Sequence, residues 1–232
     1  MRIAIVGNGK MGKRVAALAP GRGHTVHTLV NRLENAGGKA LTSERLAGAD
    51  VAIEFTRPDA AVANLERLIG LGIPTVTGTT GWSESLPRVS ELVRQRAAAL
   101  LHAANFSVGV HLFFRAARDL ARRFRGREEF GGSIHEEHHK TKLDIPSGTA
   151  LLLQRHLCEE EPGRQFPITS VRLGDALGTH AVSYSAPHET ITLIHETRSR
   201  DVFAIGALAA AEWLPGRTGV YTFDEMLFGD SG

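Results

Sequence analysis

The fold is decided by residues 2–12, RIAIVGNGKMG, in which an apolar run leads straight into a Gly-x-Gly-x-x-Gly pattern formed by Gly7, Gly9 and Gly12. The apolar run predicts a buried strand, and the helical spacing of Met11–Leu18 predicts a helix after the glycines. Glycines at this junction allow a tight turn and a close approach of backbone to a pyrophosphate, whose charge the helix N-terminus stabilises. The stretch therefore predicts a dinucleotide site. The alternative is a glycine-rich turn in an α/β protein that binds another ligand.

The alternation of strand and helix continues over the first hundred residues. Apolar runs predict further strands at Thr25–Val30, Val51–Phe55, Thr75–Thr77 and Ala99–Ala103. Helical spacing predicts helices at Asp59–Leu71 and Ser83–Ala97. Strands that are separated by helices form parallel sheets with right-handed crossovers. We therefore predict a Rossmann-type, doubly wound α/β domain over residues 1–107, which would bind the dinucleotide.

The pattern changes after Asn105, where strands begin to follow one another without helices between them. We predict helices at Val108–Arg123 and Thr149–Cys158, and strands at Gly131–His138, Thr169–Leu173, Ala181–Ser185 and Thr190–Glu196. Consecutive strands indicate an open mixed sheet, so residues 108–200 are expected to form a smaller α+β domain. Residues 201–232, with a helix at Val202–Leu214 and a short tail, are expected to return and pack on the first domain.

The end of the second strand bears on the choice of cofactor. An NAD enzyme usually places an acidic residue here to bond the ribose hydroxyls, whereas an arginine suits a 2′-phosphate. This chain has Asn31 and Arg32, with Lys10 and Lys13 as further phosphate partners and Glu34 nearby. NADPH is therefore the preferred cofactor, and NADH remains possible.

Composition excludes several classes of function. The net charge is +2 with acids and bases interspersed, which argues against nucleic acid or a membrane surface as a partner. The uncharged run after Arg2 is too short for a signal peptide, and no apolar run approaches the roughly 18 residues of a membrane span. Cys158 is the single cysteine, which favours a reducing compartment. We expect a cytoplasmic protein.

Residues 134–149, IHEEHHKTKLDIPSGT, hold the densest set of titratable groups. Within them His135-Glu136-Glu137-His138-His139 satisfies His-Glu-x-x-His, the zinc-protease pattern. That pattern needs a helix, which brings residues four apart to within about 6 Å. The glycines before it favour a strand, in which His135 and His139 would lie about 13 Å apart. We therefore predict no metal site, with a zinc hydrolase as the alternative.

The same segment fits a strand end, a loop and a helix start. Ser147 or Thr149 is suited to cap the apolar helix that follows, and the free N–H groups there would bind a carboxylate or phosphate. Lys142 and the adjacent histidines would add positive charge and proton donors. Such a loop suits a small polyanion that accepts a proton as well as a hydride. The alternative is a solvated, charged loop with His138 and His139 idle.

At this point a family resemblance enters. The segment Glu137–Ala150 closely resembles the signature E-x-H-H-x-x-K-x-D-x-P-S-G-T-A of 4-hydroxy-tetrahydrodipicolinate reductases. Other stretches resemble the family in the same order, and they are Glu54–Thr56 before Pro58, Gly78–Gly81, Ala103–Val110, and His195 followed by Ser199-Arg200. The chain departs from the family in a glycine loop that is one residue shorter and in lacking the acidic residue often found after the second strand.

The resemblance implies roles for residues in both domains. His138 and Lys142 would be the acid–base pair. Substrate carboxylates would be held by His139, Ser147, Gly148 and Thr149 together with Lys142, with Arg200 as a supporting charge. The cofactor would be bound by Gly7, Asn8, Gly9, Lys10, Met11, Gly12, Asn31, Arg32, Phe55, Thr56, Gly78, Thr79, Thr80, Ala103, Ala104, Asn105 and Phe106.

The resemblance also implies the reaction, which is NAD(P)H-dependent reduction of 4-hydroxy-tetrahydrodipicolinate to tetrahydrodipicolinate with loss of water, in diaminopimelate and lysine biosynthesis. The substrate would be a small dicarboxylate and the enzyme a homotetramer, with residues 108–200 as the substrate-binding and oligomerisation domain. Two alternatives share the fold. One is another two-domain nicotinamide dehydrogenase for an amino acid or sugar, and the other is a non-catalytic NADP-binding sensor, against which the intact His138, His139 and Lys142 argue.

Overall fold

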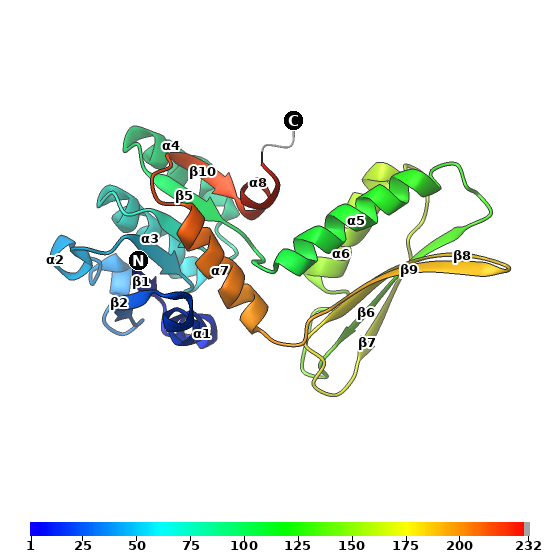
Figure 1. Cartoon of the computed structure of the whole chain (residues 1–232), viewed down its shortest axis with the longest axis horizontal. Coiled ribbons are helices and arrows are strands. Elements are labelled where there is room, and N and C mark those ends of the chain that lie inside the picture. Colours follow the sequence, from blue (N-terminus) through cyan, green and yellow to red (C-terminus); the bar gives the residue numbers. More distant parts are fainter. Residues whose placement is uncertain (230–232) are drawn as a thin grey trace. The chain divides into compact units, whose positions relative to one another are not determined.

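A computed structural model describes residues 1–229 and divides the chain into two compact units (Figure 1). The larger unit comprises Met1–Ser107 and the chain from Asp201 onward, and the smaller unit comprises Val108–Arg200. Among the described residues, no helix has the length and apolar character that crossing a membrane requires.

The larger unit is built on a six-stranded sheet in the order β10-β5-β4-β3-β1-β2, with every neighbouring pair parallel. Its strands are β1 (Arg2–Val6), β2 (Thr25–Val30), β3 (Val51–Glu54), β4 (Thr75–Thr77), β5 (Ala99–His102) and β10 (Gly219–Thr222). The central strands β1, β3 and β4 are almost completely buried because both faces of the sheet are covered. The strand order reverses between β1 and β3, and ligands of such sheets bind at the carboxyl ends of the strands beside this point.

Helices cover both faces of this sheet. One face packs against α1 (Lys10–Leu18), α7 (Asp201–Trp213) and α8 (Phe223–Phe228), and the other against α3 (Pro58–Gly70) and α4 (Leu86–Gln95). The short α2 (Ser43–Leu46) and three 3₁₀ turns, at Pro20–Arg22, Ala36–Gly38 and Ser83–Ser85, complete the unit. Small residues let α7 approach closely, since a Cβ on Gly206 would lie 1.8 Å from the Phe106 carbonyl oxygen. The predicted Rossmann-type, doubly wound domain is confirmed.

The smaller unit is a four-stranded mixed sheet with two helices on one face (Figure 1). The sheet order is β7-β6-β8-β9, in which β6 and β7 are parallel and the other pairs antiparallel. Its elements are α5 (Val108–Phe124), β6 (Gly131–His138), α6 (Gly148–Glu160), β7 (Ile168–Arg172), β8 (Thr179–Ala186) and β9 (Glu189–Glu196). Phe124 stacks on buried Tyr184 at 4.1 Å between ring centroids and joins α5 to the sheet. The predicted mixed sheet is confirmed.

Three features of the fold differ from the expectations. The helix expected over Ser83–Ala97 is a 3₁₀ turn followed by α4, and Ala97 lies beyond it with φ at 45°. Phe55 and Ala103 fall just outside β3 and β5. The expected short tail instead supplies β10 and α8, because Gly219–Thr222 pairs in register with Ala99–His102. A four-residue edge strand has too little periodicity to be recognised in the sequence.

Candidate active site

The glycine loop joins β1 to α1. Gly7 has φ at +110°, and a Cβ there would lie 2.0 Å from the Phe55 carbonyl oxygen. A Cβ on Gly12 would lie 1.8 Å from the Gly7 carbonyl oxygen, whereas one on Gly9 would meet no protein atom within 4 Å. Gly9 is the N-cap of α1 and carries no side chain over the helix end. Two glycines therefore close the turn, and the third leaves the helix N-terminus open to an anion.

A cavity of about 750 Å³ lies beside this loop. Of the residues predicted to bind cofactor, it is lined by Gly7, Asn8, Gly9, Asn31, Arg32, Phe55 and Thr56. Residues that the sequence analysis missed complete the lining, and they are Val30, Leu33, Asn35, Ala36, Gly37, Arg57, Asp59, Ala60, Ala63 and Asn64. Most of these come from the 3₁₀ turn after β2 and from the first turns of α3, whose place beside the glycine loop is set only by the tertiary fold. The size, the glycine cradle and the open helix end fit a dinucleotide.

The chain after β2 forms a tight polar turn. The Asn31 side-chain oxygen accepts hydrogen bonds from the backbone N–H groups of Leu33 and Glu34. The Glu34 carboxylate accepts one from the Asn31 backbone N–H at 2.8 Å and one from Arg45 at 3.0 Å, and these bonds lower its pKa. Arg32 is exposed, lines the cavity and forms no ion pair within residues 1–229. The Glu34 carboxylate is thus already hydrogen-bonded, and the Arg32 guanidinium is available to an anion.

A buried polar network underlies the cavity at the ends of β3 and β4. The fully buried Glu54 carboxylate accepts hydrogen bonds from Thr56 and, at 2.6 Å, from the Thr77 hydroxyl. The Thr56 backbone N–H donates to the Thr79 hydroxyl at 2.8 Å. Gly78 is in close contact with the Phe55 ring, which a Cβ would approach to 1.9 Å. Gly78 and Thr79 therefore shape the cavity wall through Phe55 and Thr56 without lining it.

The remaining predicted cofactor residues lie outside this cavity. Lys10 and Thr80 are exposed, Met11 packs on the core, and Gly12 is buried in the turn. Ala103, Ala104 and Asn105 follow β5. Phe106 is buried, with its ring edge-on to Phe55 at 5.9 Å and to Phe223 at 5.1 Å. Phe106 therefore supports the wall at Phe55 from within the core.

In the smaller unit, β6 ends at the histidine–lysine segment. Burial alternates along the strand, so that Glu136 and His138 face the helices while His135 and Glu137 lie on the opposite face. The strand separates His135 from His139 as expected from its extended spacing. Beyond it, His139 Nδ1 lies 2.8 Å from the Thr141 hydroxyl, and Lys142 Nζ pairs with the Asp144 carboxylate at 2.7 Å. A dicarboxylate that binds Lys142 would therefore compete with Asp144.

The loop leads into the N-terminus of α6. Of the two predicted caps, Ser147 is the N-cap, because its hydroxyl accepts a hydrogen bond from the Ala150 N–H at 3.2 Å. Gly148 and Thr149 form the first turn, and a Cβ on Gly148 would meet nothing within 4 Å. The first turn contains no acidic side chain. This helix end is suited to bind a carboxylate.

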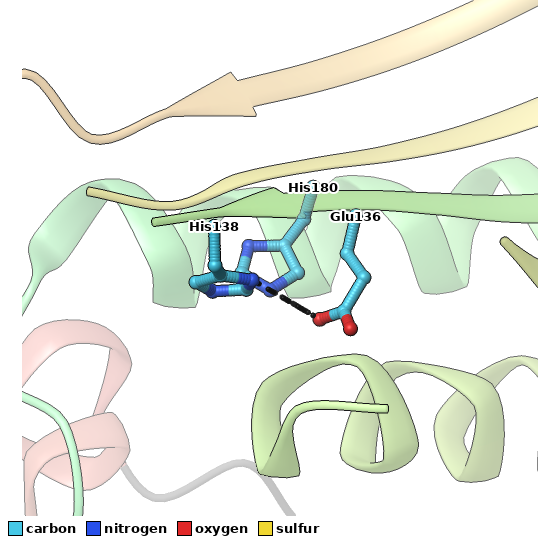
Figure 2. A group of neighbouring side chains, drawn as sticks. All are labelled: Glu136, His138 and His180. Carbon is cyan, nitrogen blue, oxygen red and sulfur yellow. Dashed lines mark ion pairs between the residues drawn. The ribbon is translucent and has the colours of Figure 1, made fainter. Parts of the chain in front are cut away.

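The sequence analysis missed a buried cluster around Glu136. His180 on β8 pairs in register with Glu136, and Arg172 on β7 pairs in register with His138. Figure 2 shows Glu136, His138 and His180 on one face of the sheet, toward α6. Glu136 accepts hydrogen bonds from the Ser147 N–H at 3.0 Å and from Arg172 at 3.0 Å. The two-residue period of β6 places Glu136 on the face of His138, but only the sheet register brings in His180 and Arg172.

Burial and hydrogen bonding shift the pKa values of the residues in this cluster. Burial alone would raise the pKa of Glu136, but hydrogen bonds from Ser147, Ser170 and Arg172 lower it to about 2. Burial lowers the pKa of His180 to about 4. Burial also lowers the pKa of His138, and the negative charge of Glu136 partly opposes this by raising it. At neutral pH the cluster therefore holds an anionic Glu136 and a neutral His180.

Glu136, His138 and His180 offer donor atoms within 4.8 Å of one another, a spacing that a metal ion could bridge. The Arg172 guanidinium, however, already donates to Glu136 Oε1. A second cation at this carboxylate would be opposed by that charge. We interpret the cluster as a hydrogen-bonded charge network.

A second cavity of about 240 Å³ lies at the open end of the sheet in the smaller unit. It is lined by His139, Lys140, Thr141, Gly174, Asp175, Leu177 and Arg200. Of the residues predicted to bind substrate, His139 and Arg200 thus share a cavity, whereas Ser147 caps α6; the predicted catalytic residue His138 is buried and does not line this cavity. His139, Lys140 and Arg200 outnumber the one acidic residue of the lining, Asp175, which favours an anionic ligand.

Known proteins resemble the chain along its whole length. A family model described as "Dihydrodipicolinate reductase, N-terminus" matches residues 1–106, and one described as "Dihydrodipicolinate reductase, C-terminus" matches residues 109–227. A protein of Christiangramia forsetii named 4-hydroxy-tetrahydrodipicolinate reductase is 35% identical over 239 residues, which cover 98% of each chain. The protein of the same name from Neisseria meningitidis is 30% identical over 98% of this chain and 97% of its own.

Solved structures show the same fold. The dipicolinate-bound dihydrodipicolinate reductase from Paenisporosarcina sp. TG-14 superposes with a TM-score of 0.79 at 21% identity, covering 96% of this chain and 97% of its own. A probable dehydrogenase from Thermotoga maritima superposes with a TM-score of 0.61 at 9% identity, covering 97% and 92% of the two chains. These two likenesses concern the architecture alone.

Proposed function

This chain belongs to the dihydrodipicolinate reductase family, and from that membership we propose that it reduces 4-hydroxy-tetrahydrodipicolinate to tetrahydrodipicolinate with NAD(P)H and releases water. The observation that carries the proposal is that one short segment joins His138, Lys142 and the N-terminus of α6, where the Gly148 N–H already bonds a carboxylate, that of Asp144. That segment offers proton donors next to a carboxylate site, and a reductase acting on a cyclic dicarboxylate needs both.

Cofactor binding is assigned to the larger unit. The N–H groups at the start of α1 would bind the pyrophosphate, and the cavity lined by Arg32, Phe55 and Thr56 would hold the rest of the dinucleotide. When bound, the nicotinamide supplies the hydride. We assign NADPH as the preferred form because Arg32 is available to a 2′-phosphate, while Oε1 of Glu34 already accepts hydrogen bonds from Arg45 and the Asn31 N–H.

Substrate binding is assigned to the smaller unit. One carboxylate would bind at the N–H groups of α6 capped by Ser147, and Lys142 would exchange Asp144 for a substrate carboxylate. His139 and Arg200 would add positive charge from the small cavity. These contacts would fix the ring, so that the reacting carbon and the proton donors are held in one geometry.

Proton delivery is assigned to His138 with Lys142. The overall reaction takes up one hydride and one proton and releases one water, and the ring nitrogen, or the enamine formed from it, must exchange a proton while the hydride adds. Burial holds the pKa of His138 below its ordinary value in the free protein. A dianionic substrate nearby would raise that pKa again, so that substrate binding itself would favour the protonated donor.

A homotetramer in the cytoplasm completes the proposal. In the smaller unit, β9 is an edge strand and carries Ile194, which is 61% exposed, on the sheet face opposite the helices. Apolar side chains on an uncovered sheet favour burial against a second copy. The mass of the particle in solution, measured by light scattering, tests the tetramer.

The activity is tested by following NADPH oxidation while a dihydrodipicolinate synthase generates substrate from pyruvate and aspartate semialdehyde. We expect oxidation that requires both the synthase and this protein, and a higher kcat/KM with NADPH than with NADH. Protein that binds NADPH but oxidises neither cofactor would favour the alternatives, a different dehydrogenase or a sensor.

A further inference from the structure

The buried carboxylate of Glu136 contacts both parts of the assigned substrate segment. Its oxygen atoms accept the Ser147 N–H at 3.0 and 3.2 Å, which ties down the start of α6. Arg172 donates to Glu136 at 3.0 Å and to the Asp144 carbonyl oxygen at 2.7 Å, which ties down the loop between β6 and α6. Glu136 itself is completely buried, so these bonds are shielded from solvent.

The third neighbour of this carboxylate is the His138 ring. His138 Nδ1 lies 3.4 Å from Glu136 Oε2, slightly beyond a normal hydrogen bond, and no other acceptor within residues 1–229 bonds to it (Figure 2). A buried ring N–H without a partner is costly, and hydrogen bonds at active sites often shorten when ligand binds. His138 Nε2 lies at the opposite side of the ring, 3.1 Å from where a Cβ on Gly178 would stand. The ring is thus held between a carboxylate and a glycine.

We propose that Glu136 is a positioning residue that orients His138 by accepting its Nδ1 proton and keeps the protonated imidazole available to the substrate. The proposal rests on the proposed function, since it names how the assigned proton donor is held. A carboxylate on one ring nitrogen fixes the tautomer and stabilises the imidazolium, which a neutral acceptor does far less. The reacting proton is then exchanged at Nε2, while the Nδ1 proton stays with Glu136.

The other charged groups around His138 leave Glu136 as the group that stabilises the protonated ring. Arg172 and Lys142 oppose protonation of the ring, and Asp144 favours it from the loop. His180 packs edge-on to His138 with ring centroids 5.0 Å apart, and its Nε2 lies 3.3 Å from the Ser147 hydroxyl. Because burial lowers the pKa of His180 to about 4, it stays neutral and does not compete for the charge of Glu136. Glu136 is therefore the nearest fixed negative charge to the His138 ring.

Two variants of Glu136 show whether its charge acts on His138 or whether the side chain only holds the start of α6 in place. Glu136→Gln keeps a carbonyl oxygen to accept the Ser147 N–H but removes the charge, whereas Glu136→Asp keeps the charge on a shorter side chain. With Glu136→Gln we expect kcat to fall about tenfold or more at pH 7.5, and the high-pH limb of the kcat profile to move to lower pH by about one unit. The limb moves down because removing the anion makes His138 lose its proton more easily. Glu136→Asp should restore the limb and part of kcat.

Controls make the result specific. Glu137→Gln changes the neighbouring carboxylate on the opposite face of β6 and should leave kcat, the pH profile and binding unchanged. Affinity for pyridine-2,6-dicarboxylate should change less than threefold in Glu136→Gln, because the helix N-terminus is still anchored. A Glu136→Gln enzyme that weakens this ligand but keeps the kcat and pH limb of the wild type would overturn the proposal.

A measurement on unmodified protein decides the matter if the variants do not fold. Solid-state ¹⁵N spectra of histidine-labelled protein distinguish the two neutral tautomers, and His138→Gln identifies the signal by its loss. We expect neutral His138 to carry its proton on Nδ1. A proton on Nε2 instead would refute the inference. Because the spectrum does not depend on turnover, failure of the proposed reaction and failure of the positioning role are distinguishable.

Discussion

Glu34 and Arg45 form an ion pair, 3.0 Å between Oε1 and Nη2, at the mouth of the turn after β2. Arg45 is fixed in turn by the Thr28 hydroxyl at 3.2 Å. The acidic residue that would otherwise bond a ribose or repel a phosphate is thereby bonded to a cation from α2. Glu34 is two residues from Arg32 in the chain, so we expect the pair to influence the choice between NADPH and NADH.

Replacing Arg45 tests this relationship. In Arg45→Ala the carboxylate of Glu34 loses its cation and is free to bond ribose hydroxyls and to repel a 2′-phosphate. We expect the ratio of kcat/KM for NADPH to that for NADH to fall about tenfold. The double variant Arg45→Ala/Glu34→Gln should recover the ratio. If the NADPH-to-NADH ratio of kcat/KM is unchanged in Arg45→Ala, then Glu34 does not influence the choice of cofactor.

Arg32 is predicted to contact the 2′-phosphate directly. Arg32→Ala removes a charge that lines the cavity and is not committed to another ion pair within residues 1–229. We expect KM for NADPH to rise about tenfold or more, while KM for NADH changes less than twofold. The NADH measurement is the internal control, and equal losses with both cofactors would contradict a phosphate contact.

The glycine turn is expected to be intolerant at one position and tolerant at another. Gly12→Ala forces a Cβ to 1.8 Å from the Gly7 carbonyl oxygen, whereas Gly9→Ala meets no protein atom within 4 Å. Gly12→Ala should destabilise the larger unit by about 1–3 kcal/mol and weaken NADPH binding measured by fluorescence. Gly9→Ala should keep the Tm of the parent. A Gly12→Ala protein with the parent's Tm would show that the turn can relax.

Lys142 is expected to be essential for turnover. Lys142→Ala removes both a proton donor and a carboxylate partner, so we expect kcat to fall about 100-fold or more. Arg155→Ala is the control, since Arg155 is an exposed cation on α6 of the same unit and lines neither cavity. Steady-state rates of the two variants give the comparison. If Lys142→Ala retains a kcat close to that of the parent, then Lys142 has no essential role in the reaction.

Stability toward acid is expected to depend on His180. Its pKa is lowered to about 4 in the folded protein, so the unfolded chain binds the proton more readily and stability falls as pH drops from about 6.5 toward 4. This shift corresponds to a loss of about 3 kcal/mol by pH 4. Urea unfolding of His180→Asn should show a flatter pH dependence over this range. His188→Asn, at an exposed hairpin position, should follow the parent, and an identical slope for His180→Asn would contradict the assignment.

Much of the fold could be predicted because local pattern and tertiary structure agree. The strands at Arg2–Val6 and Thr25–Val30 have the predicted bounds. β1 is apolar from Ile3 to Val6 because both faces of the sheet are covered there, whereas the edge strand β2 is partly exposed. The strand expected at Gly131–His138 also has the predicted bounds, and in the structure its burial alternates with a period of two. The edge strand β10 was missed, because its pairing partner lies more than a hundred residues earlier in the chain.

The candidate site divides in the same way. By itself the sequence determined the glycine turn, the cap at the start of α6 and the grouping of His138, His139 and Lys142, because each depends on residues close together in the chain. Only the tertiary structure decided that Arg45 holds Glu34, that α3 and a 3₁₀ turn complete the cofactor cavity, and that Arg172 and His180 surround Glu136. The physical reason is the register in which the strands of a sheet pair. Hydrogen bonding between strands brings distant polar groups together, and no local periodicity records which groups will meet.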